Sequence, residues 1–191
     1  MNNYLYQLKI TLLKSKPPIW RRFTVPSTFT LDNLHDVVQI VMGWTDSHLH
    51  EFIIDAEHYT NDPEGYGDGL PSNKYRLNRL IFQEGQTFSY IYDFGDYWVH
   101  KIVVEKILPV DSTTEEGKEV TCITGKRASP PEDVGGIYGY MEFCEAIKDS
   151  EHKEHDSYVE WVGEDFDPNE FDIDYINIEL DEYMSKSPNK R

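Results

Sequence analysis

Two long alternating segments constrain the fold of this chain more than any other feature. Residues 86–92 and residues 97–108 both carry apolar and polar side chains in turn. Side chains of a β-strand point alternately to opposite faces, so each segment is predicted to be a half-buried strand. The link between them, Asp-Phe-Gly-Asp at 93–96, predicts an antiparallel hairpin with Gly95 at positive φ and the aspartates bonded to turn amides. We therefore expect a sheet with one buried face.

The N-terminal residues extend this sheet. Residues 4–13 alternate and residues 19–25 are apolar-rich, and the polar, Pro-bearing link between them predicts a second hairpin. A further strand is expected at residues 48–55. A helix is expected between Thr30, a suitable N-cap, and Gly43, a C-terminal stop. Its apolar residues recur at helical spacing and must face a core: Leu31, Leu34, Val37, Val38, Val41 and Met42.

Helical patterns dominate the last third of the chain. A helix is expected near Tyr140, after a Pro- and Gly-rich connection, and a short one around residues 159–162. The last helix is expected to begin within Asp-Pro-Asn-Glu at 167–170, where Asp167 supplies the cap and Pro168 the first helical position. Strands that precede helices predict an α+β fold, a mixed, mainly antiparallel sheet with one early helix and C-terminal helices packed on it. We expect one domain over residues 1–185 and a flexible tail at 186–191.

Aromatic residues supply much of the expected core. The chain holds 9 Phe, 4 Trp and 13 Tyr, which excludes a disordered chain over most of its length. Loops are expected at residues 61–73, which are rich in Gly, Asp and Pro, and at the acidic residues 111–118. Four large side chains lie beside apolar strand or helix positions and are predicted to be core residues: Trp20, Trp44, Trp98 and Phe143.

Charge narrows the classes of function. Lys and Arg number 18 against 35 Asp and Glu, which gives a formal net charge of −17. Such a surface repels phosphate backbones and anionic lipids, so it argues against direct nucleic-acid binding and against a membrane partner. The N-terminus lacks the pattern of a signal peptide, and two cysteines suit a reducing compartment. The expected protein is cytoplasmic, with an unidentified protein or small molecule as its partner.

Four ordered segments carry a resemblance to a known family. They are Trp-Arg-Arg at 20–22 with Ser-His-Leu-His-Glu-Phe at 47–52, Tyr-Ile-Tyr-Asp-Phe-Gly-Asp at 90–96, Pro-Pro-Glu-Asp-Val-Gly-Gly at 130–136, and Phe-Asp-Pro at 166–168. Together they resemble the plasmid pRiA4b ORF-3-like family over about residues 4 to 180. The resemblance implies a compact α+β domain and little chemistry.

The resemblance also bears on mobile elements and on cysteine chemistry. Some relatives carry a resolvase-like transposon label. This chain has no arginine cluster around a nucleophilic serine, and its net negative charge disfavours DNA binding. Relatives that resemble the chain usually have cysteine where Ser129 stands. A metal or redox pair between that position and Cys122 is therefore not expected here.

Histidines and aspartates near the strand ends are the candidates for a metal site. On a strand that includes both His48 and His50, the two imidazoles share one face about 6.6 Å apart. Two such histidines can bind one divalent metal together with a third histidine, for which His100 is the candidate, or a carboxylate. The alternative is that these histidines are structural and hydrogen-bonded near the end of the sheet. We expect them to converge with Asp93 and Asp96.

The loop that contains Glu132 and Asp133 is expected to lie beside this group. Together with Asp93 and Asp96, these carboxylates are candidates for binding a cation or a polar ligand. For Glu132 and Asp133 the alternative is a rigid crossover in which they cap backbone amides or pair with Arg21 or Arg127, and for Asp93 and Asp96 it is the hairpin turn described above. No catalytic residue can be selected, because the chain has no Gly-x-Ser-x-Gly elbow and no nucleotide-binding loop.

Two functions remain open at this point. The first is a binding or interaction domain associated with mobile elements, which the acidic surface and the many Tyr and Trp residues favour. The second is a metal-dependent hydrolase, acting on phosphate esters, in which His48, His50, His100 and nearby carboxylates hold a metal with a bound water. A convergent pocket would favour the enzyme, and separately hydrogen-bonded histidines would favour the binding domain.

Overall fold

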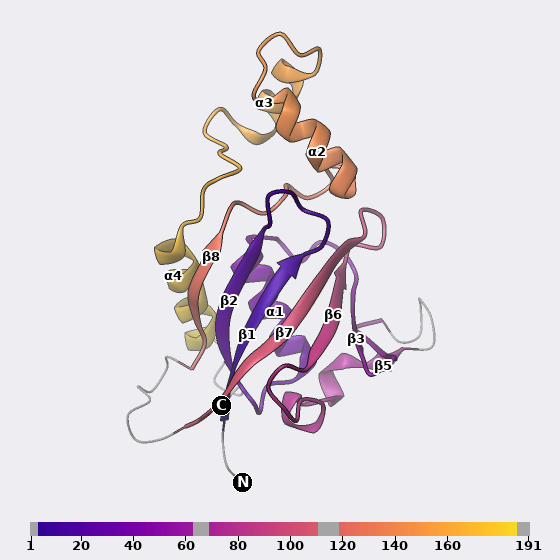
Figure 1. Cartoon of the computed structure of the whole chain (residues 1–191), viewed down its shortest axis with the longest axis vertical. Helices are drawn as coiled ribbons and strands as arrows, with labels where there is room; N and C mark the ends of the chain where they lie inside the picture. The colour runs from indigo at the N-terminus through magenta and orange to yellow at the C-terminus, as the bar shows by residue number, and fades with distance from the viewer. Residues whose placement is uncertain (1–3, 63–68, 111–118, 187–191) are drawn as a thin grey trace.

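A single mixed sheet organises the structure, a computed structural model that describes residues 4–62, 69–110 and 119–186. Within these residues the strand order is β5-β4-β3-β6-β7-β1-β2-β8 (Figure 1). Every neighbouring pair is antiparallel except β4 and β5. The strands are β1 (Tyr4–Leu12), β2 (Trp20–Pro26), β3 (His50–Ile54), β4 (Glu57–Thr60), β5 (Leu70–Pro71), β6 (Thr87–Tyr92), β7 (Trp98–Pro109) and β8 (Thr121–Lys126).

Four α-helices accompany the sheet in the described residues, which confirms the α+β class. They are α1 (Leu31–Met42), α2 (Gly136–Ala146), α3 (His155–Val162) and α4 (Ile173–Lys186), and two short 3₁₀ turns lie at Ser72–Lys74 and Leu77–Arg79. Helix α1 lies across one face of the sheet, and α4 packs against β8 and α1 (Figure 1). Helices α2 and α3 contact each other and form a lobe beyond one end of the sheet (Figure 1).

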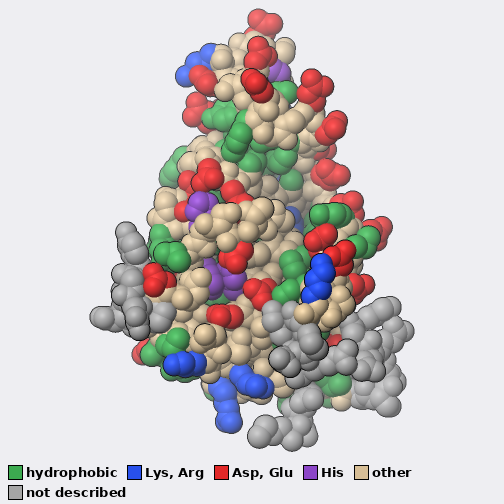
Figure 2. Space-filling view, turned by 180° about the vertical axis from the view of Figure 1, so that it is seen from behind, with side chains coloured by type: hydrophobic (Ala, Val, Ile, Leu, Met, Phe, Trp, Pro, Cys, Tyr) green, Lys and Arg blue, Asp and Glu red, His purple; other side chains and the backbone are tan. Residues whose placement is uncertain are grey.

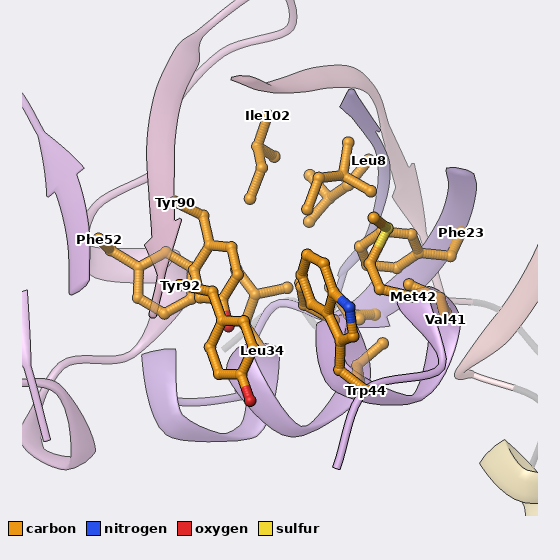
Figure 3. Close-up of a cluster of buried hydrophobic side chains, with 14 of the residues drawn as sticks. Leu8, Phe23, Leu34, Val41, Met42, Trp44, Phe52, Tyr90, Tyr92 and Ile102 are labelled. Atoms are coloured by element: carbon orange, nitrogen blue, oxygen red, sulfur yellow. The ribbon is translucent and has the colours of Figure 1, made fainter. Parts of the chain in front are cut away.

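The core lies between α1 and the sheet. The six apolar residues predicted to form the stripe of α1 are all buried, because inward-facing side chains of the central strands pack on them. In Figure 3, Tyr90 and Tyr92 of β6 point from the sheet toward the helix, where Leu34 lies, and Leu8 of β1 lies on the sheet side of this cluster. The helix begins and ends as predicted: Thr30 forms a capping box with Asn33, and Gly43 adopts a φ of 73°.

Several element boundaries differ from the expectation. Strand β3 begins at His50 rather than residue 48. Strand β8 was not predicted, because it is a short edge strand with several polar residues and an internal glycine. Helix α4 begins at Ile173 rather than at the expected Pro168, and the carboxylate that caps it belongs to Asp172, which accepts a hydrogen bond from the Tyr175 amide at 2.9 Å. Part of the loop expected at residues 61–73 is β5 and a 3₁₀ turn.

The hairpin turn and one tryptophan also differ from the expectation. The left-handed residues of the turn are Asp93 and Tyr97, both with a φ of 56°, and not Gly95. One of the two predicted aspartate–amide bonds is present, because Asp93 Oδ1 accepts from the Gly95 amide at 2.8 Å. Asp96 accepts instead from the amide of Gly135, outside the turn. Trp44, Trp98 and Phe143 are buried, but Trp20 is half-buried on the opposite face, where Lys9 Nζ lies 4.6 Å from its ring centroid.

Some expectations fall outside the described residues. These are residues 63–68 of the loop expected at 61–73, the acidic loop at 111–118, and the C-terminal tail except for Lys186, which ends α4. Among the described helices, none has the length and apolar character needed to cross a membrane.

Candidate functional site

Three connections meet at one end of the sheet: the loop after α1, the β6–β7 turn and the loop after β8. The Asp93 amide donates to the Leu49 carbonyl at 2.9 Å, which joins the first loop to the turn. The Gly135 amide donates to Asp96 Oδ2 at 3.1 Å, which joins the turn to the third loop. Residues far apart in the sequence are therefore held side by side here.

His48, Asp93 and Asp133 form a cluster in which each residue comes from a different one of these connections. His48 Nε2 lies 3.3 Å from Asp133 Oδ1 and 3.7 Å from Asp93 Oδ2. That nitrogen is shielded from solvent, and it has no hydrogen bond of good geometry with the described residues. The Asp133 side chain is 74% exposed and the Asp93 side chain 9%, so the cluster opens to solvent on one side.

Both aspartates of this cluster have left-handed backbones. Asp93 has a φ of 56° and Asp133 a φ of 62°. Most residues other than glycine avoid this conformation, although Asp tolerates it better than most. The two turns thereby aim their carboxylates at His48. Figure 2, which views the molecule from behind, shows histidine atoms at the surface with acidic side chains beside them.

Glu132 does not belong to the His48 cluster, although its neighbour Asp133 does. Its Oε1 accepts from the Tyr92 hydroxyl at 2.5 Å, and its Oε2 accepts from the Thr45 hydroxyl at 2.5 Å and the Thr45 amide at 3.2 Å. Burial and the hydrogen bond to Glu132 raise the pKa of Tyr92. Glu132 therefore links the loop after α1, strand β6 and the loop after β8.

A second histidine cluster lies deeper, between α1 and the sheet. The rings of His35 and His50 stack with centroids 3.5 Å apart and planes 8° apart. His35 Nδ1 lies 2.8 Å from the Tyr90 hydroxyl, and Nε2 lies 2.7 Å from Asp46 Oδ1. Both ring nitrogens of His50 are buried, and neither has a hydrogen-bond partner among the described residues. Burial and the neighbouring His35 lower the pKa of His50 to about 2, so this ring is neutral.

His100 is separate from both clusters. Its side chain is fully buried, with its ring centroid 5.3 Å from that of Trp44 and 5.6 Å from that of Tyr90. Its Nδ1 lies 3.3 Å from the Tyr90 carbonyl oxygen, and burial lowers its pKa to about 4.

The candidate metal ligands therefore fall into two groups. In the described residues, the sets of three donor atoms within 4.8 Å of one another are His35–Asp46–His50 and His48–Asp93–Asp133. His48 and His50 enter different groups because β3 begins only at His50, so regular strand alternation does not extend to His48. His35 was missed by the sequence reasoning, because it lies within the apolar stripe of a helix and its partner His50 comes from a strand.

The expected pairing of Arg21 or Arg127 with Glu132 or Asp133, and the chemistry of Cys122, can be compared with the structure. Arg21 is buried and donates to the carbonyls of Val41 at 2.7 Å and Lys126 at 2.9 Å, and its pairing with Glu132 or Asp133 is not observed. It also donates to Ser129 Oγ at 3.2 Å. Arg127 bonds Asn169 instead. Burial raises the pKa of Cys122 to about 11, so its thiol is protonated at neutral pH.

Comparison with known proteins identifies the family. The sequence model of the plasmid pRiA4b ORF-3-like proteins matches residues 4–175. The chain belongs to this family. A curated relative, the uncharacterised protein y4hQ of Sinorhizobium fredii (strain NBRC 101917 / NGR234), is 39% identical over 183 residues, which are 94% of this chain and 92% of the relative.

A solved structure extends the likeness to the fold. It is the crystal structure of MM3350 from Methanosarcina mazei Go1, titled a protein of unknown function. It matches with a TM-score of 0.79 and 38% sequence identity, over 91% of this chain and 98% of that chain. The likeness to MM3350 is thus one of sequence and fold, while membership of the pRiA4b ORF-3-like family is shown by the match of the family's sequence model.

Proposed function

We propose that this protein is a metal-binding domain, in which His48, Asp93 and Asp133 hold one divalent cation. The observation that carries the proposal is the convergence of three donor atoms within 4.8 Å of one another, each from a different connection. An imidazole nitrogen and two carboxylates are a donor set that suits zinc, manganese or iron.

The distances within the cluster support a bridging ion. Two ligand atoms that each lie about 2.1 Å from a tetrahedral ion are about 3.4 Å apart. His48 Nε2 lies 3.3 Å and 3.7 Å from the two carboxylate oxygens, which is longer than charge-assisted hydrogen bonds usually are. A buried nitrogen without a good hydrogen bond is also costly, and a metal bond would offset that cost.

The deeper cluster is a poorer site. His35 and Asp46 already contact each other directly at 2.7 Å, which leaves no room for an ion between those atoms. The lone pair of an imidazole nitrogen lies in the plane of its ring. Because the rings of His35 and His50 are stacked nearly parallel, their lone pairs do not point at one common ion.

Calorimetric titration of Zn²⁺ and Mn²⁺ into chelator-treated protein without an added histidine tag tests the proposal. We expect one ion per chain, and at least tenfold weaker binding by Asp133→Asn and His48→Ala. His58→Ala is the matched control, because His58 Nδ1 lies 2.7 Å from Glu51 Oε2 in an exposed pair outside the cluster. Stoichiometric binding that survives in both cluster variants, or no binding at all, would contradict the site.

A metal-dependent hydrolase of phosphate esters is the second candidate. The exposed Asp133 side of the cluster favours it, because an ion with three protein ligands keeps an open position for water, which the metal activates as a nucleophile. We expect that candidate to show hydrolysis of bis(p-nitrophenyl) phosphate by metal-loaded protein and loss of that activity in Asp133→Asn. Metal binding without turnover would favour the binding domain.

A further inference from the structure

A pocket lies where the α2–α3 lobe meets the rest of the protein. Its volume is about 350 Å³, which falls within the range of small-molecule sites. One wall comes from Trp161 and Val162 of α3 and from Phe166 just after it, and the opposite wall from the end of α1 and the loop after β8. Glu132 thus lines the pocket, whereas His48 and the two aspartates of the proposed metal site do not.

Aromatic rings form much of the lining. Trp161 is 48% exposed, although it is a large apolar side chain, and Phe166 and Trp44 line the same space. The buried Phe143 supports two of these rings from behind: its centroid is 6.1 Å from Trp161 and 5.3 Å from Phe166, in edge-on contacts. The rings are therefore held in place before any ligand arrives.

Glu132 is the charged side chain that lines this pocket, and none of the described lining residues is basic. Its hydrogen bonds come from hydroxyl groups of Tyr92 and Thr45 and from one backbone amide, all of which are neutral donors. No ion pair to Glu132 is present among the described residues. Its negative charge is therefore available to a ligand.

We propose that this pocket binds a small organic cation, an amine or a quaternary ammonium compound, through the rings of Trp161 and Phe166 and the carboxylate of Glu132. A cation is attracted to the faces of aromatic rings, and indole is the strongest of them. The carboxylate adds direct charge attraction, and the net charge of −17 raises the local concentration of cations. The same charge disfavours anionic ligands. This site is independent of the proposed metal site.

Choline and its neutral isostere 3,3-dimethylbutan-1-ol are the probes that test this inference, since they have nearly the same shape and differ in charge. In ligand-observed NMR titrations with metal-free protein, we expect saturable binding of choline and at least tenfold weaker binding of the alcohol. Trp161→Ala and Glu132→Gln should each weaken choline binding at least fivefold, whereas Trp161→Phe should retain part of it. Circular dichroism checks that each variant is folded.

The Asp133→Asn variant is the matched control, because it changes the carboxylate next to Glu132 without altering the lining of the pocket. Choline binding should be unchanged in this variant, whether or not the protein binds metal. The experiment therefore distinguishes failure of the proposed metal site from failure of the proposed cation pocket. Equal binding of choline and the alcohol would overturn the inference. So would the absence of saturable binding, or choline binding that is unaffected by Trp161→Ala.

Discussion

The side-chain amide of Asn177 pairs with both backbone polar groups of Cys122. The Cys122 amide donates to Asn177 Oδ1 at 2.8 Å, and Asn177 Nδ2 donates to the Cys122 carbonyl at 3.1 Å. Cys122 lies on β8, which ends the sheet order, and Asn177 lies on α4, which packs against that strand. The amide thereby takes the place of a neighbouring strand at one position and covers part of an edge that could otherwise pair with another chain.

Asn177→Ala is expected to destabilise the protein by about 1–3 kcal/mol, because it leaves two backbone groups beneath α4 without their partner. Urea unfolding followed by circular dichroism measures the change. Asp181→Ala, at an exposed position of the same helix, is the control and should change stability by less than about 0.5 kcal/mol. A loss for Asn177→Ala as small as that of the control would contradict the edge-covering role.

Leu180→Ala tests the prediction of one domain over residues 1–185. Leu180 is fully buried in the common core although it belongs to the last helix, so its truncation should cost about 2–5 kcal/mol. Unfolding should remain a single transition, with coincident curves from tryptophan fluorescence and circular dichroism. Ile178→Ala, at a position 57% exposed on the same helix, should have little effect. Two separate transitions would show that α4 is not part of the main cooperative unit.

His100 should make stability fall in mild acid. Burial lowers its pKa from 6.5 to about 4 in the folded protein, so the unfolded chain binds the proton more tightly. The stability that neutral His100 provides is therefore complete above about pH 6.5 and is lost as the pH falls toward 4. In His100→Leu, the decline measured by urea unfolding between pH 6 and 5 should be smaller by up to about 1.4 kcal/mol per pH unit.

Leu180→Ala provides the control for this titration. It removes a buried apolar side chain and no titratable group, so it should lower stability while leaving the pH dependence between pH 6 and 5 close to that of the wild type. His35 and His50 remain in both variants, and burial lowers the pKa of each, so part of the decline should persist in His100→Leu. An unchanged slope in His100→Leu would contradict a buried neutral His100.

Helix α1 could be predicted from the sequence almost to the residue because its determinants are local. Thr30 and Gly43 mark its ends, and its apolar spacing leaves one orientation toward a core. Strands β1, β2, β3, β6 and β7 were predictable for the same reason, since the alternation of apolar and polar side chains follows from burial on one face. Strands β4 and β5 were not predicted, because they are only four and two residues long. Strand β8 lacks a strong alternation of apolar and polar side chains. It forms a strand because β2 pairs with it on one side and α4 packs against it.

The candidate site was only partly predictable because it depends on contacts between distant segments. His48, Asp93 and Asp133 were each chosen for their chemistry, but their grouping depends on how three connections meet at the end of the sheet. The stacking of His35 on His50 depends on how α1 crosses β3, which no local pattern specifies. The cation pocket likewise requires the lobe to bring Trp161 close to Glu132.

The last prediction concerns metal-dependent stability. An ion that binds the folded chain but not the unfolded chain stabilises it by about 2.7 kcal/mol at a concentration 100 times its Kd. We therefore expect Zn²⁺ or Mn²⁺ to raise the Tm of the wild type and excess EDTA to reverse the rise. Asp133→Asn should show neither change while keeping the Tm of the metal-free wild type, because the Asp133 side chain is 74% exposed. An equal rise in that variant would place the bound ion elsewhere.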